Sequence, residues 1–575
     1  MSGFLNDVVT AEQRTPLPPP PPPMPDPDDP KYAGSPELYE KDRQAAVAAA
    51  DAFTAAAQVR GLAVAQVISQ WLATAPYAML QELLDQPKEQ MPIFKPVIGP
   101  AVVMRHEHVL QCLQRTDLFT VDPYGAEMAR ATDDKSKNPQ SFSHFMLGTD
   151  RDELYRLDDV ILRRAVSRHD ESAISAMTRK EAQRWTSAVA DAGEIDVVTT
   201  LAKYVPLRIV SDYLGVPCHE GTGPTALPGL RAGDSFRLDE DLLKVFTFTK
   251  IKEGLVPTAD DLYNWVKDAF RNTFNNFNQA APLFADFRER GIVATEYLTA
   301  YVHALLKVYK NRLRRGQTVP DTMLTRLLRM QADVAGGGAR ALAQELSSLL
   351  GAPVPEEELA RRLSDSMIRS NVFGTVVGAV VNPQEATARI ADSILRLKAG
   401  EYQALNGSSY DEATRLAGIE SGEPGYTESL EALRRYALEA LRLQPQGEVL
   451  LRLCVQDNAE LGGVPVARGT PVFVAFAAGM RDPEATPQPL AFDVQREERL
   501  TGYLQDGDRA HEAPQSQTYL QHGYGRHKCL GRYASQITMR ESLRALLRLG
   551  RLERLTALEM DEQGLYAVSL RVGFR

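Results

Sequence analysis

A ten-residue stretch near the C-terminus, residues 522–531, limits the possible folds of this chain more than any other part of its sequence. It reads His-Gly-Tyr-Gly-Arg-His-Lys-Cys-Leu-Gly and contains a single cysteine, Cys529. Gly523 and Gly525 can adopt positive φ angles and let the backbone approach a flat ligand closely. A helix-forming stretch begins at Arg532, and the free N–H groups at its start favour a thiolate at the cysteine. Such a thiolate can be an axial ligand of heme iron; a buried structural cysteine beside a glycine turn is the alternative.

The stretch resembles the heme-binding loop of the cytochrome P450 family, whose pattern is roughly Phe-Gly-x-Gly-x-(His/Arg)-x-Cys-x-Gly. The resemblance implies that Cys529 is the iron ligand of a heme b group. It also implies that Gly523, Gly525 and Gly531 belong to the loop that binds this cofactor. His527 matches a position where family members often carry a propionate contact, and a surface histidine is the alternative interpretation.

A helix upstream contains an acid–base pair that fits the same family. Glu439 and Arg442 lie three residues apart and therefore share one helical face, and Pro445 ends the helix soon afterwards. They resemble the Glu-x-x-Arg pair that supports the cysteine loop in the family. Glu431 and Arg434 have the same spacing, which is usual on a solvated helix face. The Leu-x-Pro sequence that follows Arg442 favours the later pair.

Four further segments follow in family order. Residues 448–455 form an apolar strand interrupted by Arg452, which needs an anionic partner because an unpaired buried charge is very costly. The matching arginine of the family binds a heme propionate. Residues 461–470 predict a hairpin. Residues 479–483 and 492–496 resemble the Asn-Arg-Asp-Pro and Phe-Asp-Pro-x-Arg sequences that precede the cysteine loop in the family.

Residues 146–157 resemble a family sequence, Met-x-x-x-Asp-x-x-x-His-x-Arg-Leu, that opens a helix crossing one edge of the heme. Arg156 matches the arginine of this pattern. Leu154 replaces the histidine, which removes one donor to a propionate. By this resemblance, propionate binding would depend on Arg452, His527 and Arg156.

The central helix, near residues 370–397, departs further from the family. Family monooxygenases carry (Ala/Gly)-Gly-x-(Asp/Glu)-Thr-(Thr/Ser) above the iron, where the acid and the alcohol relay protons. Residues 382–387 match this pattern best, and Glu385 keeps the acid. Ala386 stands at the alcohol position, and Thr387 comes one residue late. One residue is a rotation of about 100° on a helix, so Thr387 cannot simply take over the role.

The same segment suggests a second chemistry. Pro383 removes an N–H donor and predicts a kink. Asn382 and Gln384 offer amides, and some heme-thiolate relatives that rearrange fatty-acid hydroperoxides place such an amide over the iron. The segment is loosely similar to the heme-thiolate half of fungal fatty-acid diol synthases. Capping of a carbonyl freed by the kink is the alternative role for these amides.

Composition excludes several classes of protein. The 575 residues are 44% hydrophobic, enough for a large core, and the net charge of −10 argues against nucleic acid as a partner. Four scattered cysteines do not suggest a disulfide scaffold and favour the reducing cytoplasm. Residues 61–81 lack charge, but glutamines, a serine and a proline make them unsuited to span a membrane. We therefore expect no transmembrane anchor.

We expect three parts: a proline-rich extension without packed structure at residues 1–35, a helical extension at 36–90 and a heme domain at 91–575. Segments with a helical period dominate residues 170–400, so the fold class is mainly α with a minor β portion. The resemblance implies the cytochrome P450 fold, a helical bundle around heme with small β-sheets.

Resemblance to soluble members of bacterial type implies monooxygenation of a small apolar or lipid-like substrate, using O2 and external electrons. Arg526, Lys528 and Arg532 surround the cysteine with positive charge. This charge suits docking of a ferredoxin-type donor, or balances charge locally. The alternatives are a fatty-acid hydroperoxide isomerase or peroxygenase that needs no reductase and, more distantly, a non-catalytic heme binder or sensor.

Overall fold

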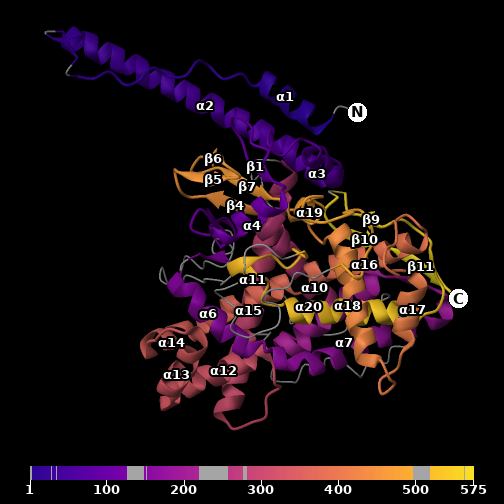
Figure 1. Ribbon diagram of the computed structural model, residues 1–575. Helices are drawn as coiled ribbons and strands as arrows, with labels where there is room; N and C mark the ends of the chain where they lie inside the picture. The colour runs from indigo at the N-terminus through magenta and orange to yellow at the C-terminus, as the bar shows by residue number, and fades with distance from the viewer. Residues whose placement is uncertain are drawn as a thin grey trace.

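Helices form most of the described chain, and short strands lie at its edges, as the sequence predicts (Figure 1). The structure, a computed structural model, describes residues 3–27, 29–33, 35–125, 148–150, 152–218, 257–275, 282–496, 518–562 and 564–575. The longer helices are α1 (Phe4–Arg14), α2 (Pro36–Thr74), α3 (Pro76–Leu84), α4 (His106–Gln114), α6 (Asp152–Ala165), α7 (Glu171–Ala188), α8 (Lys203–Arg208), α10 (Ala259–Phe270), α11 (Pro282–Arg314), α12 (Met323–Asp333), α13 (Ala339–Leu350), α14 (Glu356–Arg362), α15 (Asp365–Gly378), α16 (Val381–Lys398), α17 (Tyr410–Gly418), α18 (Tyr426–Leu443), α19 (Phe476–Gly479) and α20 (Arg532–Leu547).

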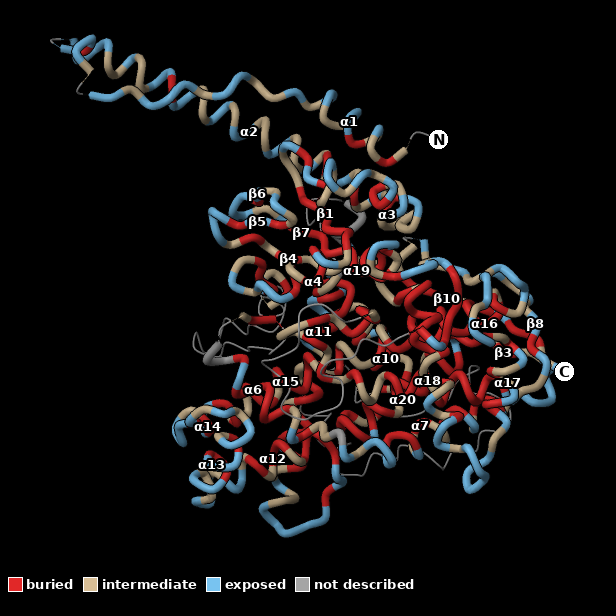
Figure 2. Tube along the Cα trace, viewed as in Figure 1, coloured by how far each residue is buried: buried red, intermediate tan, exposed pale blue. Residues whose placement is uncertain are grey.

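Three of these helices enclose the segment that follows the cysteine loop. α20 packs against α7, α16 and α18, and most of its side chains are buried (Figure 2). Met539 and Leu543 of α20 share one apolar cluster with Ile394 of α16 and Leu441 of α18. The cysteine loop is therefore attached to a fully packed helix at its C-terminal end.

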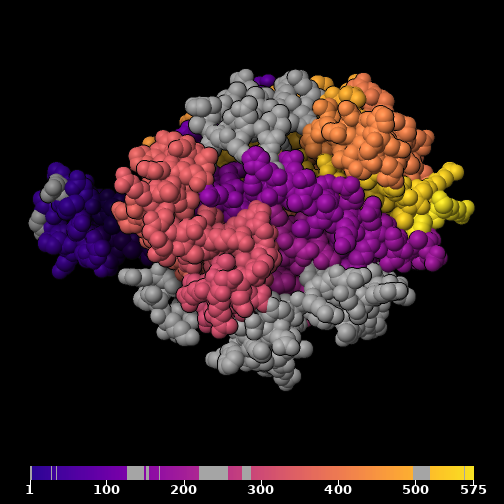
Figure 3. All heavy atoms as spheres, turned by 90° about the horizontal axis from the view of Figure 1, so that it is seen from below, coloured from indigo at the N-terminus to yellow at the C-terminus, as the bar shows by residue number. Residues whose placement is uncertain are grey.

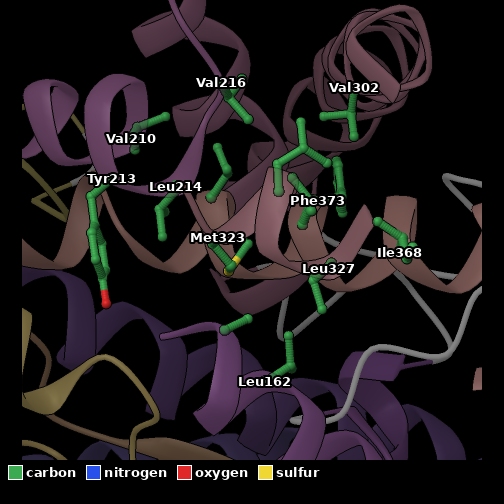
Figure 4. Packing of buried hydrophobic residues seen from close by; sticks show 14 of the residues in the cluster. Leu162, Val210, Tyr213, Leu214, Val216, Val302, Met323, Leu327, Ile368 and Phe373 are labelled. Carbon is green, nitrogen blue, oxygen red and sulfur yellow. The ribbon is translucent and has the colours of Figure 1, made fainter. Parts of the chain in front are cut away.

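A second apolar cluster holds the helices on the other side of the molecule. It joins Val302 of α11, Met323 and Leu327 of α12 and Phe373 of α15, with Leu162 of α6 beneath them (Figure 4). These side chains come from segments distant in sequence. Their packing fixes α15, the first half of the central helix, against the outer helices.

Four strands form a small sheet in the order β1 (Ala101–Val103), β7 (Pro471–Val474), β4 (Leu450–Cys454) and β2 (Phe119–Thr120). β1 is parallel to β7, and β4 is antiparallel to both of its neighbours. Arg452 lies on β4, inside this sheet. The hairpin predicted at residues 461–470 is confirmed as β5 (Ala459–Leu461) and β6 (Val464–Val466).

Five further short strands, four of them from the C-terminal region of the sequence, form two small sheets. β3 (Glu194–Asp196), β11 (Arg571–Phe574) and β8 (Leu552–Arg554) form an antiparallel sheet in that order. β9 (Glu559–Met560) pairs with β10 (Ala567–Ser569). This last pair brings the C-terminal region against the central helix, because the Ala567 N–H donates to Glu385.

The central helix is broken where the sequence predicts a kink. α15 ends at Gly378 and α16 begins at Val381. Pro383 has no N–H, so the Ala379 carbonyl four residues earlier has no helical partner. The break therefore lies one turn before the proline.

The N-terminal part departs from one expectation. α2 projects from the body and α1 lies back beside it, forming an arm on one side of the molecule (Figures 1 and 3). We expected no packed structure in residues 1–35, yet α1 is anchored by buried Phe4 and Val8. Glu82 of α3 also accepts the Phe4 N–H at 2.7 Å. Residues 16–26 form neither helix nor strand.

Membrane insertion finds no support among the helices. Of those in the described ranges, none combines the length and the apolar character that crossing a bilayer requires.

Candidate heme site

The loop around Cys529 is held by its own backbone. Gly523 and Gly525 have φ angles of 74° and 64°, which strain any other residue. The Cys529 N–H donates to the His522 carbonyl at 2.9 Å. The N–H of Gly531 donates to the Cys529 sulfur. The loop therefore presents one sulfur atom in a fixed position just before α20.

Electrostatics around the sulfur act in two directions. Burial raises the pKa of the Cys529 thiol, whereas the Gly531 N–H and the cations Arg532 and Arg163 lower it. A coordinated metal ion would deprotonate such a thiol outright. The surroundings thus stabilise a metal-bound thiolate and leave a free thiol protonated.

Of the three positive residues near the sulfur that could dock an electron donor or balance charge locally, Arg526 is half-buried and the other two are buried. Lys528 and Arg532 are each only 5% exposed. Buried cations cannot contact an electron carrier at the surface. Of the two roles considered for these residues, local charge balance is the one compatible with their burial.

Glu439 and Arg442 form a fully buried ion pair. Two Arg442 nitrogens lie 2.8 and 2.9 Å from the two Glu439 oxygens, and neither side chain is exposed. The alternative pair is different: Glu431 and Arg434 also bond, but the Glu431 side chain is 50% exposed. The Leu-x-Pro signal therefore selected the pair that lies in the core.

Partners of this ion pair come from both segments that precede the cysteine loop. Arg442 donates to the carbonyls of Met480, Pro489 and Ala491. Arg496 lies 3.3 Å from Glu439.

Tyr519 extends the same cluster into the loop. Its hydroxyl donates to Glu439 at 3.2 Å, and it precedes His522 by three residues. Sequence analysis did not assign Arg496 or Tyr519 to this cluster. The resemblance at residues 492–496 was the available signal for Arg496.

Arg452 and His527 lie close together, and each has one nitrogen that makes no hydrogen bond to a described residue. Arg452 Nε and His527 Nδ1 are buried and lack hydrogen-bond partners in the part of the chain that the structure describes. No described carboxylate pairs with Arg452, which donates to the Leu451 carbonyl. Burial lowers the pKa of His527, and the charge of Arg452 lowers it further. The Arg452 Nε–H is suited to an anionic group such as a propionate. His527 Nδ1 can donate only when the imidazole carries a second proton, because Nε2 already donates to Asp150.

The other nitrogen of His527 is held by Asp150. His527 Nε2 lies 2.5 Å from Asp150 Oδ1, and the other Asp150 oxygen accepts from Thr120 and the Val121 N–H at 2.8 Å. Tyr155 packs edge-on against His527, and its hydroxyl donates to the carbonyl of the adjacent loop residue. We did not predict either contact.

Arg156 is not brought to this group, because its side chain is exposed on α6. Part of the predicted segment 146–157 (Met146, Leu147 and Arg151) lies outside the described residues, as does the side chain of Leu154.

Glu385 is buried behind the break in the central helix. Its Oε1 accepts the Ala567 N–H at 2.8 Å, and Oε2 lacks a hydrogen-bond partner among the described residues. Arg389 Nε lies 3.7 Å from Oε2. Burial raises the pKa of Glu385 to about 7, although Arg389 and the Ala567 N–H oppose this. The carboxyl can thus change protonation state near neutral pH.

Neighbouring polar residues take different positions. Thr387 lines a small space between helices with Ile390, Met539 and Leu543, so it faces α20. Asn382 is half-buried at the start of α16. Gln384 is hydrogen-bonded to the Tyr263 hydroxyl. Its amide therefore contacts α10, a partner that the local sequence does not indicate.

Comparison with known proteins agrees with this geometry. The cytochrome P450 family profile matches residues 427–567. The structure of the histidine-tagged, open cytochrome P450 EryK from S. erythraea superposes with a TM-score of 0.55, covering 87% of this chain and 97% of that one at 19% identity. The segment with the Glu439–Arg442 pair and the cysteine loop thus matches the cytochrome P450 family, and the fold is that of a solved P450 structure. The low identity means that the structural likeness bears on the fold alone.

Two curated P450 relatives match short segments. Oryzalexin E synthase of Oryza sativa subsp. japonica is 37% identical over 121 residues, which are 20% of this chain and 22% of that protein. The bifunctional dioxygenase–epoxy alcohol synthase of Pyricularia oryzae is 31% identical over 129 residues, 22% of this chain and 10% of that protein. The chain thus matches about a fifth or less of each relative's length.

The residues present fit a heme. Cys529 can supply a sulfur ligand, and Arg452 has an unused Nε–H for a propionate, which His527 can join when its imidazole is doubly protonated. A Cβ added at Gly378, the last residue of α15, would meet no atom within 4 Å, so the end of that helix is open.

Replacing Glu439 by glutamine should strongly destabilise the protein. Arg442 and Arg496 would keep their buried charges without the carboxylate that balances them. We expect a loss of about 3–5 kcal/mol in the free energy of unfolding, by urea denaturation. Glu431→Gln on the same helix is the matched control, with an expected loss below about 1 kcal/mol. Equal losses in the two variants would contradict the importance of the buried pair.

Glu385 should make stability depend on pH. Its pKa is raised to about 7 from 4.5, so the native state keeps a proton that the unfolded state releases between those pH values. Wild-type stability should fall as pH rises through this window, and Glu385→Gln should lack this component. We expect the difference between the two to change by on the order of 2 kcal/mol from pH 4.5 to 8, in urea titrations. Parallel pH curves would contradict it.

Proposed function

We propose that this protein is a heme-thiolate monooxygenase that oxidises a small apolar or lipid-like molecule with O2 and external electrons. The observation that carries the proposal is the fixed loop that presents the Cys529 sulfur, together with the unused Nε–H of Arg452. The cofactor would be heme b. The match of residues 427–567 to the cytochrome P450 family supports this reaction class.

The chain's own residues have separate tasks in this proposal. Bound heme supplies the redox chemistry, and its thiolate ligand favours O–O cleavage. Gly531 and the surrounding cations stabilise the charge on sulfur. Glu385 holds a proton at Oε2, which is free of other hydrogen bonds among the described residues, while Oε1 stays fixed by Ala567. An acid with a pKa near the working pH suits proton delivery.

The proposed electron donor is a separate ferredoxin-type protein, as the resemblance to bacterial-type members implies. Burial of Lys528 and Arg532 means that such a donor must dock on other residues. We also propose a cytoplasmic location, which is supported by four free cysteines, three of them buried.

A second candidate is rearrangement of a fatty-acid hydroperoxide without external electrons. Two observations favour it. Thr387 faces α20, so its hydroxyl does not replace the alcohol missing at Ala386. The chain also shares a segment with a fungal protein named as an epoxy alcohol synthase. Asn382, half-buried at the start of α16, would then supply the amide that steers O–O cleavage.

Cys529→Ser tests the metal ligand. The reduced carbon-monoxide complex of the wild type should give the absorption band that marks a thiolate ligand, and the variant should lose it. Cys454→Ser, at a buried cysteine of β4, is the control and should keep the band. A band that survives in Cys529→Ser, or a wild-type protein that binds no heme, would refute the assignment.

The two reactions separate by their need for electrons. Under the monooxygenase proposal, turnover stops when reduced ferredoxin is omitted, and Glu385→Gln lowers the fraction of electrons recovered in product. Under the alternative, a fatty-acid hydroperoxide is consumed without any donor, and Asn382→Ala slows this by about tenfold or more. Donor-free turnover of a hydroperoxide at full rate would reject the monooxygenase as the main activity.

A further inference from the structure

Lys267 on α10 is a half-buried cation for which the described structure provides no anionic partner. It forms no ion pair with a described residue, and its ammonium lies 5.7 Å from the ring centres of both Tyr263 and Tyr566. Asp268, the next residue, is turned by about 100° on the helix. Burial lowers the pKa of Lys267, and the charge of Arg271 lowers it further. An anion at this position would stabilise the lysine.

Nearby carboxylates are already committed to other groups. Asp561 pairs with Arg271, one turn after Lys267, and also accepts two backbone N–H groups of the loop between β9 and β10. Glu385 holds the Ala567 N–H with Oε1. Arg271 Nε is buried and has no hydrogen-bond partner within the described ranges. The cluster therefore has one cation without an ion pair among the described residues, although Asp561, Asp268 and Glu385 partly offset its charge, and one spare guanidinium donor.

Aromatic rings continue from this cluster toward the candidate heme site. Tyr566 and Phe270 have ring centres 6.5 Å apart, Phe270 and Phe274 are 4.8 Å apart, and Phe274 and Tyr124 are 5.1 Å apart. The Tyr124 hydroxyl accepts a backbone N–H of β4 at 2.5 Å, one residue before Arg452. An apolar chain lying along these rings would extend from the lysine toward the propionate donors.

We propose that Lys267, together with Arg271, binds the carboxylate of an acidic apolar substrate, such as a fatty acid, where α10, α16 and the β9–β10 loop meet. This inference rests on the proposed oxidation of a lipid-like molecule and specifies its substrate class. Charge-assisted hydrogen bonds from the ammonium and the guanidinium hold the acid end. The aromatic row from Tyr566 to Tyr124 contacts the chain. Gln384 and Glu385 place the cluster directly against the break in the central helix.

Binding of a matched acid and ester tests this inference. The heme-loaded full chain is titrated by calorimetry with octanoic, dodecanoic and hexadecanoic acids and with their methyl esters, at pH 8. We expect at least one acid to bind about tenfold or more tightly than its ester. Lys267→Met should reduce that ratio to about one, whereas Lys267→Arg should retain it.

Lys307→Met, at an exposed lysine on α11, is the matched control and should leave the ratio unchanged. The inference is overturned if no acid binds, if acid and ester bind equally in the wild type, or if Lys267→Met weakens both ligands equally. Equal weakening would mean that the lysine only supports Tyr566. Heme content is read from the absorption spectrum before ligand is added, so failure of the heme assignment is seen separately.

Discussion

The rest of this structure depends on a carboxylate and a guanidinium that have no contact with water. Removing two charges from solvent costs several kcal/mol per ion, and the cost is recovered only when every donor and acceptor is satisfied. Glu439 and Arg442 meet this condition because they bind each other, three backbone carbonyls, Arg496 and Tyr519. These partners lie in the segments leading to Cys529. The position of the Cys529 sulfur therefore follows from how a buried charge is neutralised.

Many features of the cysteine loop and of the segments that support it could be predicted from local sequence. Positive φ at Gly523 and Gly525, a helix starting at Arg532 and an arginine inside a strand at 452 each follow from the properties of single residues or short spacings. Glu439 could be separated from Glu431 only by the Leu-x-Pro that follows. Only the tertiary structure shows that Glu439 and Arg442 are buried, because both acid–base pairs have identical spacing.

Other features depend on contacts between distant segments and could not be predicted. The Asp150–His527 contact spans 377 residues, and nothing local marks it. Lys528 was assigned a possible role in docking a partner because the sequence shows its charge but not its burial. α1 was missed because its stability comes from Glu82 and the apolar surface of α2 and α3, since its own sequence resembles an exposed tail. In each case the outcome depends on contacts between segments that are distant in the sequence.

The bond from the Ala567 N–H to Glu385 has a thermodynamic consequence. An ionised carboxylate accepts this hydrogen bond more strongly than a protonated one, so the proton on the central helix and the position of the C-terminal strand pair are linked. By reciprocity of linked equilibria, any ligand that displaces Ala567 must raise the proton affinity of that acid by the same free energy. Binding of such a ligand and protonation of Glu385 are therefore linked in one equilibrium.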